Sequence, residues 1–342
     1  MSRDPRTATV AGAWADGIRR VNGAPFVLAG MFALTLLVAL PLSTALSGMI
    51  EAHLGDSLSA DSVAAGVDLD WWQEFSAQAQ GLGTTFVPSI VGFGAVLDNL
   101  SGVLDNLPMA TTIAGATAAW LVLWSFLSGG VIDRYARQRP TRAYGFFAAC
   151  GTHFWRFLRL GALAWIVYWI LFALVHPWLF DDLHPWLTHD LVVERTAFLI
   201  RAALYALFGA LLVLANLVFD YARIRIVVED RYSAIGAFVA GARFVRRHPA
   251  TLRLYLLNGL VFLALALAYA LIAPGAPAGA AIWLALLVGQ IYILLRHYVK
   301  LLFYASQTSY FQSALAHAAY TAAPTVVWPD SPAAESIGNA SH

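Results

Sequence analysis

The sequence has few charged residues, a single cysteine and a single lysine. Charged residues make up 12% of the 342 positions and hydrophobic residues 60%, whereas a soluble domain carries about 25% charged residues. A chain this apolar cannot cover itself with polar side chains, so its exterior is predicted to face lipid. The lone Cys150 excludes an internal disulfide framework and gives no cysteine-based zinc pattern. The formal net charge of +1 lacks the positive excess that nucleic-acid binding requires, so no nucleic-acid partner is expected.

Signatures of catalysis and of cofactor binding are also missing. The chain contains no GxSxG nucleophile motif, no glutamate pair of an intramembrane protease and no GxxxxGK[ST] phosphate-binding loop. No acidic residue falls in the middle of an apolar stretch, which argues against proton-coupled transport. These absences predict a protein that is not an enzyme and that needs no cofactor.

Six stretches are apolar and long enough to cross a bilayer, which takes about 20 residues of helix. They cover about 25–49, 109–132, 160–179, 196–219, 254–273 and 280–303. We therefore predict an all-α polytopic membrane protein in which residues 1–320 form one integral membrane domain. The Pro-, Ser- and Ala-rich residues 321–342 are predicted to be a disordered cytoplasmic tail. A cleaved signal peptide is the alternative for the first stretch, although its apolar run is longer than is typical.

The arginines are distributed unevenly between the connections. Residues 51–108 contain eight acidic residues and no basic one, whereas residues 134–159 and 223–253 contain six and seven arginines. Short basic loops remain in the cytoplasm. Both termini are therefore predicted to be cytoplasmic, in a multi-pass protein of the bacterial inner membrane with membrane lipids as its first partners.

A similar short segment precedes each predicted pair of spans. The three segments are residues 14–25, 146–157 and 238–249. Aligning Gly17, Gly151 and Gly241 also superposes Pro25 on Pro249. In the third segment apolar residues recur at i, i+3, i+4 and i+7, the spacing of one helix face. We predict amphipathic elbow helices that lie along the inner membrane surface and that the two prolines end.

The even-numbered spans also end in similar sequences. These are IDRYARQ (132–138), FDYARIR (219–225) and LFYASQ (302–307), which align Tyr135, Tyr221 and Tyr304. Tyrosine at this depth is typical of the aromatic belt at a membrane interface. The predicted architecture is three repeated hairpins, each preceded by a cytoplasmic elbow helix, with a fourth, degenerate elbow at 309–320. Chance similarity in a chain rich in Ala and Arg is the alternative.

A resemblance to known membrane proteins rests on two segments, FDYARIRIVVEDR (219–231) and AFVAGARFVRRHP (237–249). Residues 133–157 show a looser similarity to the same pattern. The chain resembles poorly characterised bacterial six-span membrane proteins, including the membrane domain attached to some glycerophosphodiester phosphodiesterases. The resemblance covers nearly the whole chain, but its motifs have low specificity. It implies no established chemistry, and the phosphodiesterase barrel is absent, so hydrolase activity is not implied.

The predicted outer loop, residues 51–108, is too long for a turn. DLDWWQEF (68–75) places Trp71, Trp72 and Phe75 beside acidic residues, which is typical of a helix at the lipid headgroups. Further on, leucines recur at heptad-like spacing, at Leu97, Leu100, Leu104 and Leu107. We predict an amphipathic helix that caps the outer face. A docking surface for a periplasmic or membrane partner and a re-entrant loop through 84–97 are the alternatives.

The segment HPWLFDDLHPWLTHD (176–190) concentrates histidines and aspartates at the outer end of the third span. Its tryptophans suit a membrane interface, and its prolines are expected to end and restart helix where the chain leaves the bilayer. We interpret it as a membrane exit. The alternative is a metal site, for which the candidate ligands are His176, Asp181, His184 and His189, although the spacing is not that of an HExxH motif.

Polar side chains within spans are costly, so they are candidates for contacts with helices, lipid or solute. Arg201, near the outer end of span four, is expected to reach outward or to pair with an acidic residue at 182, 190 or 194. Asn216, Asn258 and Gln290 are expected to bridge helices. Arg296 is expected to reach for lipid phosphates at the inner end of span six.

Asp220 and Arg223 lie at the inner end of span four and share a helix face at i, i+3. We predict an ion pair that fixes the joint between this span and the next elbow. A gate or a partner contact is the alternative.

These observations favour a non-enzymatic scaffold, assembly factor or accessory subunit of a membrane complex. The alternative is a carrier or binder of lipid or a small amphiphilic solute, with a cavity between the repeats lined by Arg201, Asn216 and Gln290. An enzyme built on the His/Asp segment is the third hypothesis.

Overall fold

The computed structural model describes residues 9–55, 57–65, 68–87, 100–107, 111–138, 142–272 and 281–322. Over these residues the chain is helical and contains no strand. Six helices are long and apolar enough to cross a membrane. The prediction of an all-α chain is thereby confirmed for the described residues, and its six long apolar helices indicate a multi-pass membrane protein. The turn at 274–278, Leu97, most of the 84–97 segment and the tail beyond residue 322 lie outside the described residues.

The helices follow one another along the chain with short connections. They are α1 (Val10–Asn22), α2 (Pro25–Leu54), α3 (Ser59–Ala65), α4 (Leu69–Gln78), α6 (Thr111–Arg137), α7 (Ala143–Ile170), α8 (His184–Thr188), α9 (Glu194–Val228), α10 (Ala234–Arg247), α11 (Ala250–Ile272) and α12 (Ala281–Ala322), with a 3-10 turn η1 (Gly81–Thr85) and π-helical turns η3 (Leu171–Val175) and η4 (Trp178–Leu183). The spans correspond to α2, α6, α7 with its continuation to Thr188, α9, α11 and α12.

Two short helices, α1 and α10, each precede a long one. The Thr9 side chain accepts a hydrogen bond from the Gly12 amide to cap α1, and Ser233 caps α10 in the same way. Pro25 occupies the first turn of α2, where its missing N–H costs nothing. Pro249 separates α10 from α11, so a proline marks both junctions.

The second segment, 146–157, is not a separate helix. It forms the first half of α7, which continues without a break into the span, because FLRLG at the junction contains no proline to interrupt it. Residues 309–320 likewise continue α12. The prediction of a distinct elbow at these two positions is therefore wrong.

Pro177 and Pro185 do not end the third span. The helix continues from Ala143 to Thr188, with a π-helical turn just before each HPW sequence. The His176 amide bonds the carbonyl of Leu171, five residues back. Such a widened turn lets a helix accommodate a proline, so the predicted helix break is replaced by two local bulges.

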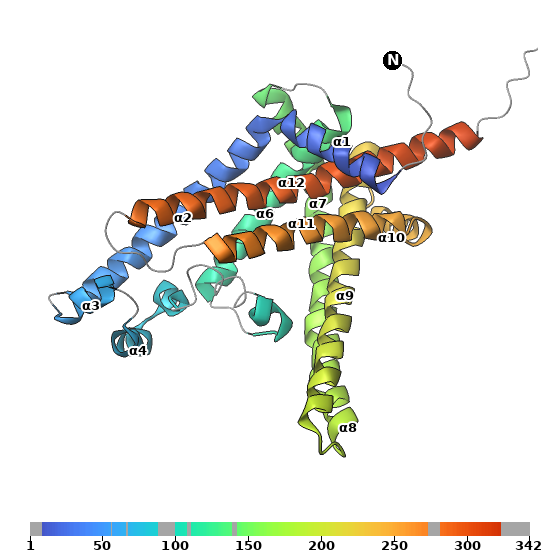
Figure 1. The fold of residues 1–342 in the computed structure, drawn as a ribbon. Helices are drawn as coiled ribbons and strands as arrows, with labels where there is room; N and C mark the ends of the chain where they lie inside the picture. Colours follow the sequence, from blue (N-terminus) through green and yellow to red (C-terminus); the bar gives the residue numbers. More distant parts are fainter. Residues whose placement is uncertain are drawn as a thin grey trace, which may run out of the picture.

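The long helices meet at one end of the molecule, which we call the hub (Figure 1). The hub consists of α1, α10, the ends of α6 and α9, the first half of α7 and the middle and end of α12, and one buried apolar cluster fills it. Tyr135, Tyr221 and Tyr304 all belong to this cluster, with at most 4% of each residue exposed. Their assignment to a lipid-facing aromatic belt is therefore wrong, because protein rather than headgroup surrounds them.

Glycine permits close helix contact at three places in the hub. A Cβ at Gly17 on α1 would lie 2.8 Å from the Ser306 Cα on α12. A Cβ at Gly241 on α10 would lie 3.0 Å from the Val218 carbonyl oxygen on α9. Between α6 and α7 the glycine is on the span instead: a Cβ at Gly130 would lie 2.9 Å from the carbonyl oxygen of Phe146.

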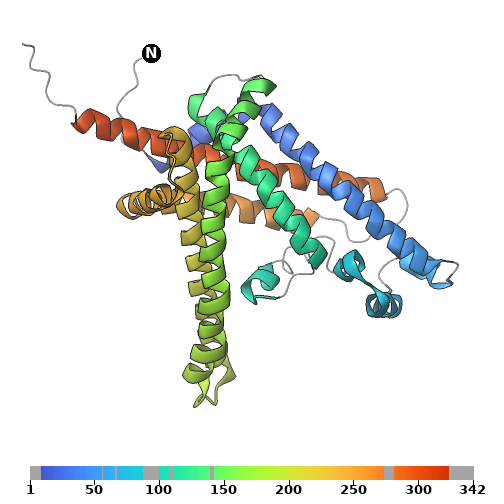
Figure 2. The ribbon, with the colours of Figure 1, turned by 180° about the vertical axis from the view of Figure 1, so that it is seen from behind.

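Away from the hub the helices diverge. The pair α7–α9 and the pair α11–α12 each run side by side, and the two pairs leave the hub in different directions (Figure 1, and from behind in Figure 2). The first span, α2, packs on α12 rather than closely on α6. At its far end α2 carries α4, whose Trp71 and Phe75 are buried against His53. These two aromatic side chains therefore pack on protein and not at the headgroups.

Candidate functional site

Asp220 and Arg223 lie in a partly buried polar cluster between four spans. Arg223 Nη1 donates to Asp220 Oδ1 at 3.1 Å and to the Tyr304 hydroxyl at 3.3 Å. Trp124 Nε1 donates to the same hydroxyl, also at 3.3 Å. Tyr304 on α12 therefore connects α9 with α6 through one oxygen atom.

Lys300, the only lysine of the chain, belongs to the same cluster. Its Nζ lies 3.9 Å from the centroid of the Trp124 ring, one helical turn before Tyr304 on α12. The cluster thus contains two cations, Arg223 and Lys300, and the Asp220 carboxylate. The face of the Trp124 ring offsets part of the cost of burying the second cation.

Tyr168 brings α7 into this arrangement. Its hydroxyl donates to Asn216 Oδ1 on α9 at 2.8 Å. Asn216 and Asp220 are one turn apart on α9, but Asn216 is exposed, so this contact lies at the outer margin of the cluster. Within the described residues the cluster pairs no nucleophile with a general base. Its chemistry suits the fixing of helix register, because a buried network is costly when a partner is displaced.

Further polar contacts attach α11 and α2 to α12. Asn258 Nδ2 donates to Ser306 Oγ at 2.9 Å, and Thr35 Oγ1 and His297 Nε2 share a hydrogen bond of 2.9 Å. Gln290 is also on α12, and its side-chain oxygen is buried without a hydrogen-bond partner among the described residues. Arg296, on the same helix, is exposed.

Arg20 makes a second junction, which sequence reasoning did not single out. Its Nε donates to Asp16 at 2.7 Å, and its Nη1 donates to the Tyr135 carbonyl oxygen at 2.9 Å and to Gln312 Oε1 at 2.8 Å. Burial raises the pKa of Asp16, but hydrogen bonds from Ser309 and Arg20 and the Arg20 charge outweigh it and leave this pKa below its ordinary value. Arg20 thereby ties α1 to the ends of both α6 and α12.

At the end of α7 and α9 far from the hub, His176 contacts the outer loop directly, and Arg201 is connected to it through Tyr205. His176 is buried and shares a hydrogen bond of 2.8 Å with the Leu104 carbonyl oxygen. Arg201 Nη2 donates to the Tyr205 hydroxyl at 3.2 Å, and this hydroxyl in turn donates to Asp105. Arg201 forms no ion pair with the acidic residues at 182, 190 or 194, all of which the structure describes. Residues 100–107 are therefore docked on the α7–α9 pair.

The four candidate metal ligands have separate environments, and Asp181 is exposed. His176 contacts Leu104 and the Phe180 ring, and His189 pairs with Asp190 at 2.8 Å. His184 Nε2 is buried without a hydrogen-bond partner in the described region. No group of three or more His, Cys, Asp or Glu residues in the part of the chain that the structure describes is arranged to hold a metal ion.

Arg201, Asn216 and Gln290 do not line one cavity. Arg201 and Asn216 are fifteen positions apart on α9, or about 22 Å along the helix axis at a rise of about 1.5 Å per residue. The first contacts Tyr205 and the second Tyr168. Asn216 instead lies one helical turn from Asp220 on α9 and bonds Tyr168.

Comparison with known proteins gives no relative: no family model, no curated protein and no solved structure matches this chain.

Proposed function

We propose that this protein is a non-enzymatic scaffold or accessory subunit of a complex in the bacterial inner membrane. Its spans would be three tandem hairpin repeats, with both termini and the arginine-rich connections in the cytoplasm. The hub contains the ends of the spans that border these connections, and this common location supports the orientation because Arg-rich segments stay on the cytoplasmic side.

The packing of the short helices supports the repeat. The first half of α7 packs on α6, and α10 packs on α9, so each follows the span that precedes it in the chain. The first of the short helices, α1, packs on α12. Three equivalent contacts would thus close a ring, with α1 and α10 as amphipathic elbows along the membrane surface.

The observation that carries the scaffold proposal is the contrast between the hub and the rest of the spans. In the most apolar stretch of α6, 39% of the residues are buried. In the corresponding stretches of α2 and α11, only 6% and 11% of the residues are buried. Outside the hub, the spans therefore present long apolar helix faces that lipid or the spans of a partner can cover. On the other side, the described parts of the outer loop 51–108 include the helices α3 and α4, which offer a surface to a periplasmic or membrane partner.

Site-specific photocrosslinking tests this proposal in intact membranes. A photoreactive amino acid at Leu260 on α11, which is 62% exposed, should give a discrete crosslinked protein of constant mass. The same amino acid at Phe262, which is 36% exposed on the other side of α11, is the matched control for random collision. Equal labelling at both positions with no discrete product, together with a monomer carrying only lipid after mild extraction, would contradict the scaffold role.

A lipid or solute carrier is the second candidate, and one observation favours it: a groove beside α7. That groove is lined by residues other than Arg201, Asn216 and Gln290.

A further inference from the structure

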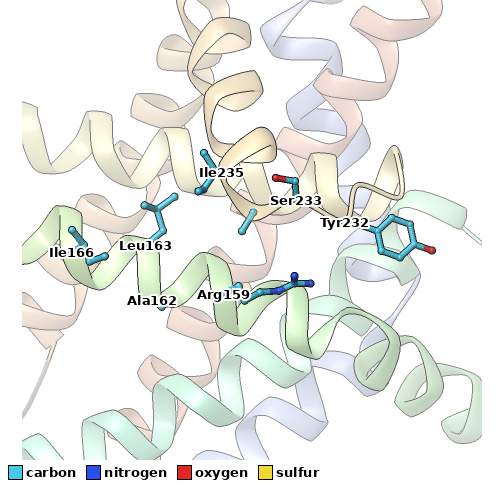
Figure 3. Close-up of a pocket in the computed structure, with 8 residues that line it drawn as sticks. Arg159, Ala162, Leu163, Ile166, Tyr232, Ser233 and Ile235 are labelled. Carbon is cyan, nitrogen blue, oxygen red and sulfur yellow. The ribbon is translucent and has the colours of Figure 1, made fainter.

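A groove of about 600 Å³ lies between α7 and the segment that begins α10 (Figure 3). Its walls are Arg159, Ala162, Leu163 and Ile166 from α7, and Tyr232, Ser233, Ala234 and Ile235 from the other side. The four α7 residues are spaced i, i+3, i+4 and i+7, so they form one face of the helix. Both walls are thus regular and continuous with helices anchored in the hub.

The groove changes from polar to apolar along its length. Figure 3 shows Arg159, Ser233 and Tyr232 toward one side and Leu163 and Ile166 toward the other. Arg159 and Ile166 are seven residues apart, or about 10 Å along the helix axis. Over this distance the groove lining changes from a charged side chain to apolar ones. The distance matches a lipid headgroup together with the upper part of an acyl chain.

Arg159 has no carboxylate partner in the described region, because the acidic residues nearby are bound by other arginines. Asp230 is bound by Arg156, whose guanidinium also lies 3.8 Å from the centroid of the Tyr232 ring. Glu229 is bound by Arg225 and Arg231. Arg159 is exposed, and its Nε donates only to the Trp155 carbonyl oxygen at 3.2 Å. The polar side therefore has net positive charge and suits an anion.

We propose that this groove binds an anionic phospholipid of the surrounding bilayer. The Arg159 guanidinium would contact the phosphate, with the hydroxyls of Tyr232 and Ser233 as further donors, and an acyl chain would follow Leu163, Ile166 and Ile235. The charge of Arg159 carries the phosphate assignment, and the apolar floor distinguishes a lipid from a free anion. The inference needs the groove to lie at headgroup depth in the inner leaflet, as proposed above, and it does not depend on the scaffold role.

Native mass spectrometry of the full-length protein, released from detergent after titration with defined lipids, tests the inference. Phosphatidylglycerol and phosphatidylcholine with identical acyl chains are compared, and inorganic phosphate is the headgroup-only probe. We expect wild-type protein to prefer phosphatidylglycerol. Arg159→Gln should weaken that preference by about fivefold, the equivalent of the ~1 kcal/mol that one arginine contributes near an anionic lipid surface, and Arg159→Glu should abolish it.

The matched control is Arg243→Gln, which removes an exposed arginine of α10 that does not line the groove. It should leave the preference unchanged. Ala162→Trp, which fills the middle of the groove, should reduce binding of both lipids, and circular dichroism should show the helix content of wild type. Equal loss in the Arg159 and Arg243 variants would overturn the site, and full competition by inorganic phosphate would overturn the lipid assignment. A failed scaffold test would not alter any of these results.

Discussion

The close helix contacts in the hub can be tested with three glycines that align in the sequence repeat, Gly17, Gly151 and Gly241. The structure gives these glycines very different surroundings. A methyl group at Gly17 would lie 2.8 Å from Ser306 Cα and 2.9 Å from its backbone nitrogen. Because these are backbone atoms, α1 must shift to relieve the clash. At Gly241 the nearest atoms are 3.0 and 3.1 Å away, and at Gly151 no atom lies within 4 Å. The three positions should therefore respond very differently to alanine.

Two effects of opposite sign act at each position. Replacing glycine by alanine within a helix favours the helix by about 1 kcal/mol, and forcing a methyl group into a packed contact costs about 1–3 kcal/mol. The first effect is common to all three helices and cancels when variants are compared. We expect Gly17→Ala to be about 1–3 kcal/mol less stable than Gly151→Ala, with Gly241→Ala between them.

The free energy of unfolding can be measured by circular dichroism during titration of mixed micelles with sodium dodecyl sulfate. Gly151→Ala is the internal control, because it changes the same aligned residue in an open environment. If Gly151→Ala lost as much stability as Gly17→Ala, or if Gly17→Ala matched wild type, the description of the α1–α12 contact would be refuted.

Three further predictions concern the polar contacts. Asp220→Asn should cost about 3 kcal/mol in the same titration because it leaves two partly buried cations, Arg223 and Lys300, without a carboxylate. Arg223→Met should cost less, because Asp220 keeps Lys300 as a neighbour, and the double variant should lose less than the sum of the two single losses; additive losses would contradict the pairing. His176→Ala should accelerate amide hydrogen exchange of residues 100–107, and His189→Ala, at an exposed histidine bound to Asp190, should not; equal effects would refute the docking contact. The hydrogen bond from Tyr205 holds the pKa of Asp105 below its ordinary value of 3.8, with a further contribution from Ser101. Because the folded-state pKa is the lower one, this stabilisation is present above pH 3.8 and is lost as the pH falls through the folded value. Hydrogen-exchange protection of 100–107 should therefore decline on acidification in wild type and decline less in Tyr205→Phe, which keeps only the Ser101 contribution; an equal decline would contradict the Tyr205 contact.

Composition and the apolar runs were sufficient to predict six spans, because the cost of exposing polar backbone in lipid leaves an apolar chain few alternatives to helix. Pro25 and Pro249 also marked real helix junctions. The predicted helix boundaries were wrong where the effect of proline on a helix was assumed without its surroundings. The junction after 146–157 has no proline, so the helix continues, and Pro177 and Pro185 are absorbed by π-helical turns.

The candidate site was predictable only where it is local. Asp220 and Arg223 are three residues apart, so their contact follows from helix geometry. Trp124 and Lys300 reach the same cluster from α6 and α12, and no local pattern connects them. The alignment of Tyr135, Tyr221 and Tyr304 did contain that information, but tyrosine suits both a membrane interface and a buried hydrogen-bonding site, and the sequence does not distinguish them.

The orientation of the chain is the central claim, and labelling of introduced cysteines in intact cells tests it most directly. In a Cys150→Ser background, single cysteines replace Gln73 on α4 and Arg246 on α10, both of which are exposed. A membrane-impermeant maleimide should label the cysteine at position 73 in intact cells and the one at 246 only after the inner membrane is broken. The reverse pattern, or equal labelling of both positions in intact cells, would contradict the account.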